Sequence, residues 1–158
     1  MVALLIATTL AWSALEAASS RAEPASRWTR EHAGALTTGL ALLVVHATAI
    51  GEHVLWGAAG SPAGLALIAI GVTLRIAAIR TLGDDFVSMR TVPRRRVTTG
   101  VYRWVRHPSE LGLVLAAMGA AVLLGSRGAA VVVLVVLVPL SLQRCRAEDR
   151  LLAGHASR

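Results

Sequence analysis

Long apolar segments alternate with short polar ones along most of this chain. A helix needs roughly 20 apolar residues to cross the hydrocarbon core of a bilayer. Five segments approach that length: Met1 to Ser19, Ala33 to Trp56, Pro62 to Ile79, Leu111 to Ser126 and Gly128 to Gln143. We therefore expect an all-α integral membrane protein with about five transmembrane helices.

The last two segments are joined by Gly125-Ser126-Arg127-Gly128, which is too short for anything but a tight turn. The sequence thus predicts a C-terminal helical hairpin, kinked at Pro139. The whole chain, 1–158, then forms a single membrane domain. It comprises three N-terminal helices in 1–79, a cytoplasmic loop in 80–110, the hairpin in 111–143 and a charged tail in 144–158.

Arginines are distributed unequally between the connecting segments. With five spans, every loop or tail that is rich in arginine falls on one side of the membrane, and only Arg127 falls on the other. The positive-inside rule then predicts an N-terminus outside and a C-terminus in the cytoplasm, as in a bacterial inner membrane. A signal peptide is the alternative for the first segment, with Ala17-Ala18-Ser19 near the cleavage site. The segment lacks the basic start of such peptides.

Composition supports the membrane assignment. Hydrophobic residues make up 55% of the chain and aromatic residues only 4%, so the apolar residues are mainly the small and aliphatic types of closely packed membrane helices. The formal charge of +7 comes from arginines between apolar runs, where topology explains them better than a nucleic-acid partner. Soluble nucleotide-binding motifs such as G-x-G-x-x-G or the Walker loop do not occur.

Two polar clusters flank the predicted hairpin. The first runs from Gly100 to Gly112 and contains Tyr102, Arg103, Arg106 and His107, followed by Pro108 in the first turn of the next helix. Free amides at that helix start, together with Arg106, suit an anionic group. The second cluster, residues 144–150, follows the hairpin and should therefore return close to His107. Its carboxylates, Glu148 and Asp149, can accept hydrogen bonds from ribose hydroxyls. The competing interpretation is a solvated helix end in which Glu148 pairs with Arg144.

Ionisable residues within the predicted spans are also candidates for function, because charge at membrane depth is costly. His46, Glu52 and His53 lie in the second segment, where we expect a polar helix contact or a pocket lining rather than a metal site. Glu16 and Arg75 can pair with each other, or Arg75 can extend to the cytoplasmic surface.

The first cluster resembles the G-x-Y-R-x-x-R-H-P-x-x-x-G box of the isoprenylcysteine carboxyl methyltransferase-like family, which overlaps in pattern with phospholipid N-methyltransferases. The resemblance extends from about Gly71 to Leu152. It includes the helix end before the loop, the hairpin turn and a segment, Arg146 to Leu152, that usually carries paired Glu. It implies a membrane enzyme that uses S-adenosylmethionine. The implied cofactor-binding residues are Tyr102, Arg106, His107, Pro108, Gly112, Glu148 and Asp149.

Catalytic candidates follow from the same resemblance and from methyl-transfer chemistry. Direct displacement needs positioning and exclusion of water rather than a covalent enzyme intermediate. Arg103 or Arg106 can orient a carboxylate acceptor. Glu110 stands where many members have an aromatic residue, and it can bind a cationic or amine acceptor instead. We expect the acceptor to be a lipophilic small molecule that enters from the bilayer.

A second departure from the family lies at the C-terminal end. Members commonly continue past the acidic pair with an F-G-x-x-Y-x-x-Y-type tail, whose absence here predicts a more open site, a closing partner or homo-oligomer, or a degenerate protein. Two alternatives to the methyltransferase remain at this point. One is an NADPH-dependent membrane sterol-type reductase, and the other is a non-catalytic membrane scaffold with the same fold.

Overall fold

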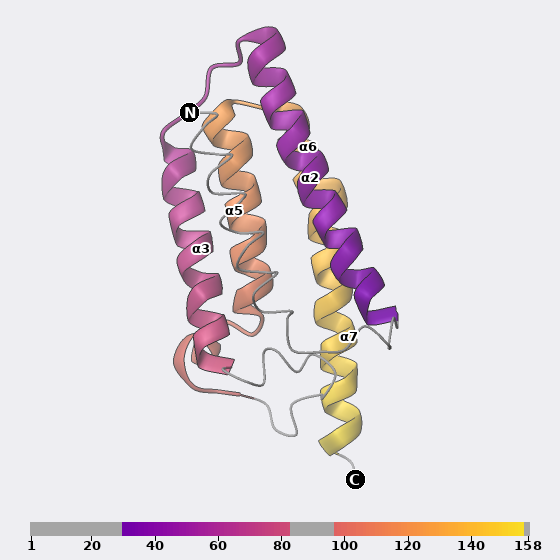
Figure 1. Cartoon of the computed structure of the whole chain (residues 1–158). Helices are drawn as coiled ribbons and strands as arrows, with labels where there is room; N and C mark the ends of the chain where they lie inside the picture. The colour runs from indigo at the N-terminus through magenta and orange to yellow at the C-terminus, as the bar shows by residue number, and fades with distance from the viewer. Residues whose placement is uncertain (1–29, 83–96, 157–158) are drawn as a thin grey trace.

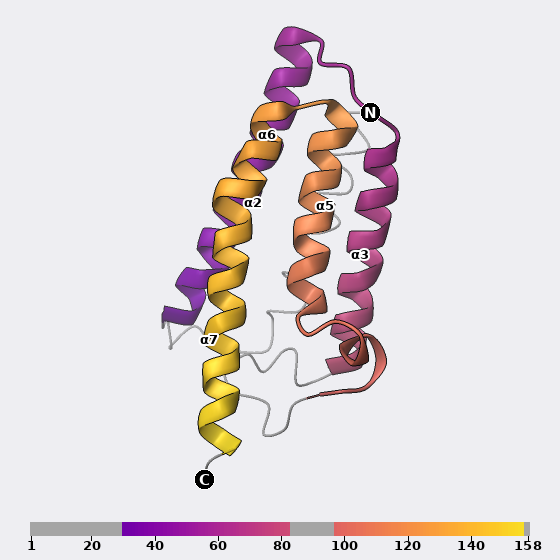
Figure 2. The same cartoon turned by 180° about the vertical axis from the view of Figure 1, so that it is seen from behind.

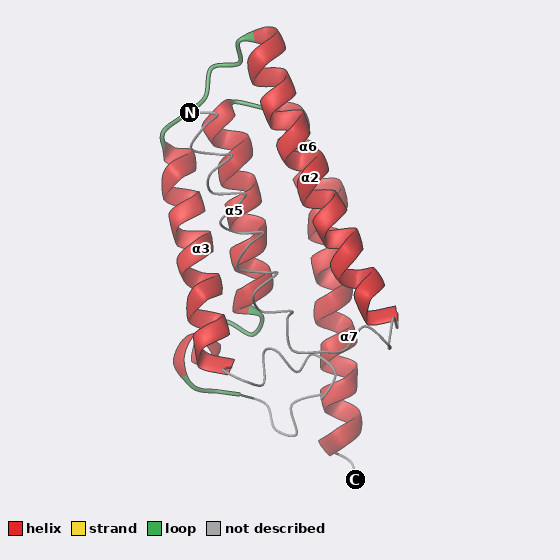
Figure 3. Cartoon of the chain, viewed as in Figure 1, coloured by secondary structure: helices red, strands yellow, loops and turns green. Residues whose placement is uncertain are grey.

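The computed structural model describes residues 30–82 and 97–156, with side chains placed for residues 37–82 and 97–150. Every regular element in these ranges is helical, as Figure 3 shows. The elements are α2 (Arg30–Trp56), α3 (Ala63–Leu82), the 3-10 turn η1 (Gly100–Arg103), α5 (Pro108–Leu124), α6 (Arg127–Val132), the π-helical stretch η2 (Val133–Leu137) and α7 (Val138–Ala156). The all-α prediction is confirmed for this part of the chain. The first predicted segment, Met1 to Ser19, lies outside the described residues.

The helices run alternately in opposite directions, with α3 beside α5 and with α2 beside α6 and α7 (Figures 1 and 2). The α2–α3 connection and the α5–α6 turn therefore lie at one end of the bundle. The C-terminal ends of α3 and α7 and the start of α5 lie at the other end. Consequently, the described arginines that follow spans gather at one end, and Arg127 lies at the opposite end.

Three helices in the described ranges are long and apolar enough to cross a membrane: Thr37–Trp56, Ala63–Leu82 and Arg127–Arg150. The fourth predicted span is an apolar helix of 17 residues, Pro108–Leu124. At about 1.5 Å per residue it falls slightly short of a hydrocarbon core of about 30 Å. Large apolar side chains are exposed on the outer faces of the bundle, including Leu40, Leu43, Leu134 and Val135. Such surfaces are suited to lipid chains rather than to water.

Glycines bring α3 and α5 into close contact. Gly71 and Gly112 face each other across the two helices, and a Cβ atom on either would lie 2.5 Å from the carbonyl oxygen of the other. One heptad further along each helix, Gly64 and Gly119 form an equivalent contact. Small residues at such crossings allow helix backbones to approach, which is how membrane helices commonly gain packing energy without a hydrophobic driving force.

The predicted hairpin turn is confirmed and is built by two residues. Gly125 ends α5 in the left-handed region, with φ of 69°, and its N–H donates to the carbonyl groups of Ala121 and Val122. Ser126 caps the next helix, because its Oγ accepts a hydrogen bond of 3.0 Å from the amide of Ala129. A glycine at the helix end and a serine at the next helix start are the favoured residues for these positions.

The helix of the second hairpin arm is irregular immediately before Pro139, where the sequence predicts a kink. Residues Val133–Leu137 form a π-helical stretch, and the N–H of Val138 donates to the carbonyl of Val133, five residues earlier. Proline has no N–H to continue the ordinary α-helical pattern, and a wider turn before it accommodates this gap. The two arms of the hairpin can then lie against α2 as well as against each other.

Two of the three ionisable residues singled out in α2, Glu52 and His53, make polar contacts with other parts of the bundle, as the sequence predicts. Glu52 accepts hydrogen bonds of 3.1 and 3.3 Å from the N–H of Gly128, at the start of α6. His53 Nδ1 lies 3.1 Å from the carbonyl oxygen of Ala58 and 3.3 Å from that of Leu124, and His46 bonds within its own helix. Glu52 and His53 therefore hold α2 against the hairpin turn, at the end of the bundle far from the arginine-rich cluster.

Candidate active site

The segment between α3 and α5 turns back to the bundle through η1. Gly100 adopts a positive φ of 56°, and a Cβ there would lie 2.7 Å from Thr81 Oγ1 at the end of α3, so any other residue would be strained and would displace Thr81. Tyr102 N–H donates to Thr99 O, and Trp104 N–H donates to Val101 O, each at 3.1 Å. The turn thus places Tyr102 and the residues after it close to the end of α3.

His107 and Pro108 form the start of α5. Pro108 occupies the first helical position, as predicted, and His107 is the residue immediately before the helix. The carbonyl of His107 accepts a hydrogen bond from the N–H of Leu111 at 3.1 Å. Proline is favoured at this position because the amide of the first turn has no helical partner in any case. His107 is thereby placed directly before the first turn of α5.

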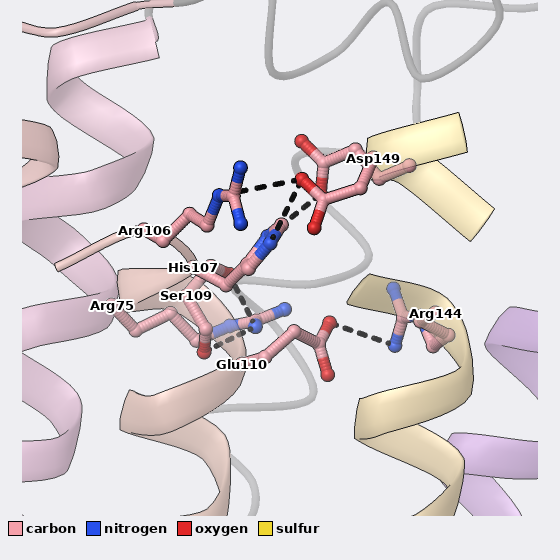
Figure 4. Close-up of polar contacts among 8 residues, drawn as sticks. Arg75, Arg106, His107, Ser109, Glu110, Arg144 and Asp149 are labelled. Carbon is pink, nitrogen blue, oxygen red and sulfur yellow. Dashed lines mark hydrogen bonds and ion pairs between the residues drawn. The ribbon is translucent and has the colours of Figure 1, made fainter. Parts of the chain in front are cut away.

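The two polar clusters converge as the sequence predicts (Figure 4). His107 Nδ1 lies 3.1 Å from Glu148 Oε2, and His107 Nε2 lies 3.5 Å from Asp149 Oδ1. Arg106 Nε forms a longer ion pair of 3.6 Å with the same Asp149 oxygen, and its side chain is 59% exposed. The residues Arg106-His107-Pro108, here called the R-H-P box, stand at the start of α5. Through Arg106 and His107 this box contacts both carboxylates of α7.

A second ion pair lies next to the first. Glu110 extends from the first turn of α5 to Arg144 of α7, with 3.2 Å between Oε1 and Nη1, and its side chain is only 13% exposed. Arg144 also donates to Thr38 Oγ1 of α2 at 3.2 Å. Glu148 does not take Arg144 as its partner among the described contacts. Glu148 and Asp149 instead contact His107 at the start of α5.

Arg75 is a member of this site that the sequence did not assign to it. Arg75 is buried, with 4% exposed, and its Nη1 donates to Ser109 Oγ at 2.7 Å and to Ser109 O at 3.3 Å (Figure 4). Its other predicted partner, Glu16, lies outside the described residues. The sequence did carry one signal for placing Arg75 in the site, namely a charged residue near the end of an apolar helix. Arg75 ties α3 to the residue between Pro108 and Glu110.

Comparisons with known proteins identify the family of this chain. A sequence profile of the isoprenylcysteine carboxyl methyltransferase family matches residues 64–154, which include α3, η1, the box, the hairpin and the acidic pair. The chain belongs to this family. It is 38% identical over 68 residues to a protein of Mus musculus named protein-S-isoprenylcysteine O-methyltransferase, covering 40% of this chain and 24% of the mouse protein. No solved structure matches the chain.

Two of the candidate site residues, Arg103 and Gly112, make their described contacts outside the cluster of charged residues. The guanidinium carbon of Arg103 lies 5.4 Å from the centre of the Trp104 ring, and Trp104 is 81% exposed. This pair resembles an interfacial anchor rather than a part of the cluster. Gly112 packs against Gly71 and Arg75 in the α3–α5 contact, so its evident role is helix packing. A role for either residue in binding stays a prediction.

Tyr102 lies among the charged residues of the family box. Burial raises its pKa to about 12; the carboxylate of Glu148 also raises it, and the guanidinium of Arg75 partly opposes the shift. The phenol therefore keeps its proton at any physiological pH and can donate a hydrogen bond to a ligand. A phenolate at this position is not available as a base.

The single tyrosine of the chain allows a direct test. We expect the near-ultraviolet absorbance of tyrosinate to rise with a midpoint near pH 12 in the folded protein and near pH 10 after unfolding in urea. Because the unfolded chain loses this proton first, stability should fall as the pH rises from about 10 to about 12. A midpoint near 10 in the folded protein would contradict the burial of Tyr102.

Proposed function

We propose that this protein transfers a methyl group from S-adenosylmethionine to a lipophilic acceptor, either a carboxylate or an amine, at the cytoplasmic face of the membrane. The proposal is carried by one observation: the R-H-P box contacts the acidic pair, with His107 3.1 Å from Glu148 and Arg106 3.6 Å from Asp149. These contacts join two segments that the matched family profile also contains.

The polar atoms of the site fit the functional groups of S-adenosylmethionine. Carboxylates such as Glu148 and Asp149 accept hydrogen bonds from ribose hydroxyls, and the exposed guanidinium of Arg106 can pair with a carboxylate. Nε2 of His107 is buried and makes no hydrogen bond with a described residue, although Asp149 Oδ1 lies 3.5 Å away, so it could still bond to a ligand between α5 and α7. When bound, this cofactor supplies a methyl group on a positively charged sulfur.

The residues of the chain would contribute by positioning and by excluding water. The Tyr102 hydroxyl and the His107 ring nitrogen provide hydrogen bonds from one side, and the acidic pair provides them from α7. Arg106 is the better placed of the two arginine candidates to orient an acceptor carboxylate, because Arg103 lies over Trp104. Holding reactants in line in a site with little water accounts for a large part of such rate enhancements.

The surroundings of the site support the membrane face and the acceptor named in this proposal. The site lies at the arginine-rich end of the bundle, which the positive-inside rule assigns to the cytoplasm. This assignment suits a bacterial inner membrane. The adjoining helices expose aliphatic side chains, so an acceptor with an apolar tail can approach from the lipid. A closing partner or a second copy of the chain would complete a site that is open to solvent at Arg106.

The proposal is tested by transfer of a labelled methyl group. Protein in vesicles that contain a bacterial lipid extract should move label from S-adenosylmethionine into the organic phase. Glu148→Gln should reduce this transfer, whereas Glu52→Gln, at the opposite end of the bundle, should not. No label in the organic phase from folded protein would contradict methyl transfer. Oxidation of NADPH under the same conditions would support the reductase instead.

A further inference from the structure

We infer that Glu110 is a positioning residue, because it holds the guanidinium of Arg144 away from Glu148 and so keeps Glu148 available to His107 and to the cofactor. The inference rests on the methyl transfer proposed above and deepens it on the cofactor side of the site. The carboxylate of Glu110 lies 3.2 Å from Arg144, whereas that of Glu148 lies 3.1 Å from the ring of His107. Glu110 itself need not touch the cofactor or the acceptor.

Two polar contacts between α5 and α7 lie about one helical turn apart. His107 and Glu110 are three residues apart at the start of α5, and Arg144 and Glu148 are four residues apart in α7. Residues at these spacings share a helix face. The contact of His107 with Glu148 is the more exposed one, and the ion pair of Glu110 with Arg144 lies deeper, since the Glu110 side chain is only 13% exposed (Figure 4).

Arg144 has a second carboxylate within reach on its own helix. An arginine and a glutamate four residues apart in a helix commonly pair, and that spacing relates Arg144 to Glu148. The Glu148 side chain is 51% exposed, so it has room to turn toward Arg144. An arginine bound to Glu148 would occupy the acceptor positions that His107 and a ribose hydroxyl can use.

The charge distribution around Glu110 explains why Arg144 pairs with it rather than with Glu148. Opposite charges attract more strongly where water is scarce, and Glu110 is the more buried of the two carboxylates. The charge of Arg75 acts on both partners, attracting Glu110 and repelling Arg144. Thr38 accepts a further hydrogen bond from Arg144, but a neutral hydroxyl supplies no countercharge. Without the charge of Glu110, Arg144 would therefore turn toward Glu148.

The first test measures the affinity for S-adenosylmethionine by calorimetry in a neutral detergent. Glu110→Gln should weaken binding by about tenfold, because Arg144 then competes with the cofactor for charge-assisted hydrogen bonds of Glu148. Adding Arg144→Gln removes the competitor, so the double variant should bind within about threefold of the wild type. If the ion pair only stabilised the fold, the double variant would bind no better than Glu110→Gln.

A matched variant separates this competition from an effect of net charge on a cationic cofactor. Arg80 is an exposed arginine in the last turn of α3. The double variant Glu110→Gln, Arg80→Gln has the same net charge as Glu110→Gln, Arg144→Gln, but it keeps Arg144. Its affinity should stay as low as that of Glu110→Gln. Glu52→Gln, at the opposite end of the bundle, should bind like the wild type.

The second test needs no cofactor. Unfolding in dodecyl sulfate is measured for Arg144→Gln, Glu148→Gln and their combination, first in the wild type and then with Glu110→Gln present. The two substitutions should be additive in the wild type, because Arg144 and Glu148 are not paired there, and non-additive with Glu110→Gln. The same curves show which variants fold. Glu110→Asp, whose carboxylate is one methylene shorter, should give the same pattern and replaces Glu110→Gln if that variant does not fold.

The two tests together separate the possible failures. Weak binding by Glu110→Gln that Arg144→Gln restores and Arg80→Gln does not, with coupling of Arg144 to Glu148 only when Glu110 is replaced, supports the inference. If the wild type binds the cofactor but Arg144→Gln restores nothing, if Arg80→Gln restores equally, or if Arg144 and Glu148 stay additive, the inference is wrong and the proposed function stands. If folded wild-type protein does not bind the cofactor, the proposed function is wrong, and the coupling alone decides whether Glu110 holds Arg144 away from Glu148.

Discussion

Replacing Gly112 with alanine should lower the free energy of unfolding by about 1–3 kcal/mol, the usual cost of overpacking a tight contact. A Cβ at residue 112 would lie 2.5 Å from the carbonyl oxygen of Gly71 and 3.0 Å from the amide nitrogen of Arg75. Both are backbone atoms, so α3 and α5 must move apart. Unfolding by dodecyl sulfate, followed by far-ultraviolet circular dichroism, would measure the loss.

Gly51→Ala is the matched control, because no heavy atom outside its own helix lies within 4 Å of its Cβ position. Removing a glycine from a helix interior should stabilise the protein by up to about 1 kcal/mol, the opposite sign. Gly71→Ala opens the same contact as Gly112→Ala, so the double variant should be less destabilised than the sum of the two. Equal stabilities of Gly112→Ala and Gly51→Ala would show that the two helices are not in close contact.

Replacing His107 with alanine should weaken binding of S-adenosylmethionine by about ten- to a hundredfold, as expected for the loss of a hydrogen bond to a charged group. The variant removes the ring that lies 3.1 Å from Glu148 and 3.5 Å from Asp149. Without the imidazole, the two neighbouring carboxylates of α7 also lose their contact with the start of α5. Calorimetric titration of the detergent-purified variant would measure the affinity.

His46→Ala provides the comparison for His107→Ala. His46 lies in α2 and its Nδ1 bonds to the carbonyl of Leu42 within the same helix, at 2.7 Å. Its removal should leave the affinity for the cofactor unchanged. If the His46→Ala and His107→Ala variants bind S-adenosylmethionine with equal affinity, His107 does not contribute to binding of the cofactor.

The convergence of the two polar clusters could be predicted because it follows from chain connectivity. Gly125 and Ser126 allow only a tight turn, so the segment after the second arm must return to the segment before the first. His107 and Glu148 are 41 residues apart in sequence and 3.1 Å apart in space for that reason. The placement of Pro108 followed equally from local chemistry, since proline suits a first helical turn.

The ion pairs within the site were harder to predict, because each charged residue has several oppositely charged residues at similar sequence spacing. Helical spacing suggests Glu148 for Arg144, but the rotation of α7 against α5 selects Glu110. For Arg75 the sequence offered a pair with Glu16 or an extension to the cytoplasmic surface. It did not point to Ser109, which the close α3–α5 contact places within reach of the guanidinium. The repeated glycines Gly64, Gly71, Gly112 and Gly119 carried the signal for that contact, as each pair is spaced by seven residues.

Binding of S-adenosylmethionine to the detergent-purified protein tests the central claim most directly. Calorimetry with the wild type, with a His107→Ala, Glu148→Ala variant and with NADPH as a competing ligand would measure it. The account predicts saturable binding of S-adenosylmethionine by the wild type, loss of that binding in the variant, and no binding of NADPH. Well-folded wild-type protein that binds NADPH, or neither ligand, would contradict the account.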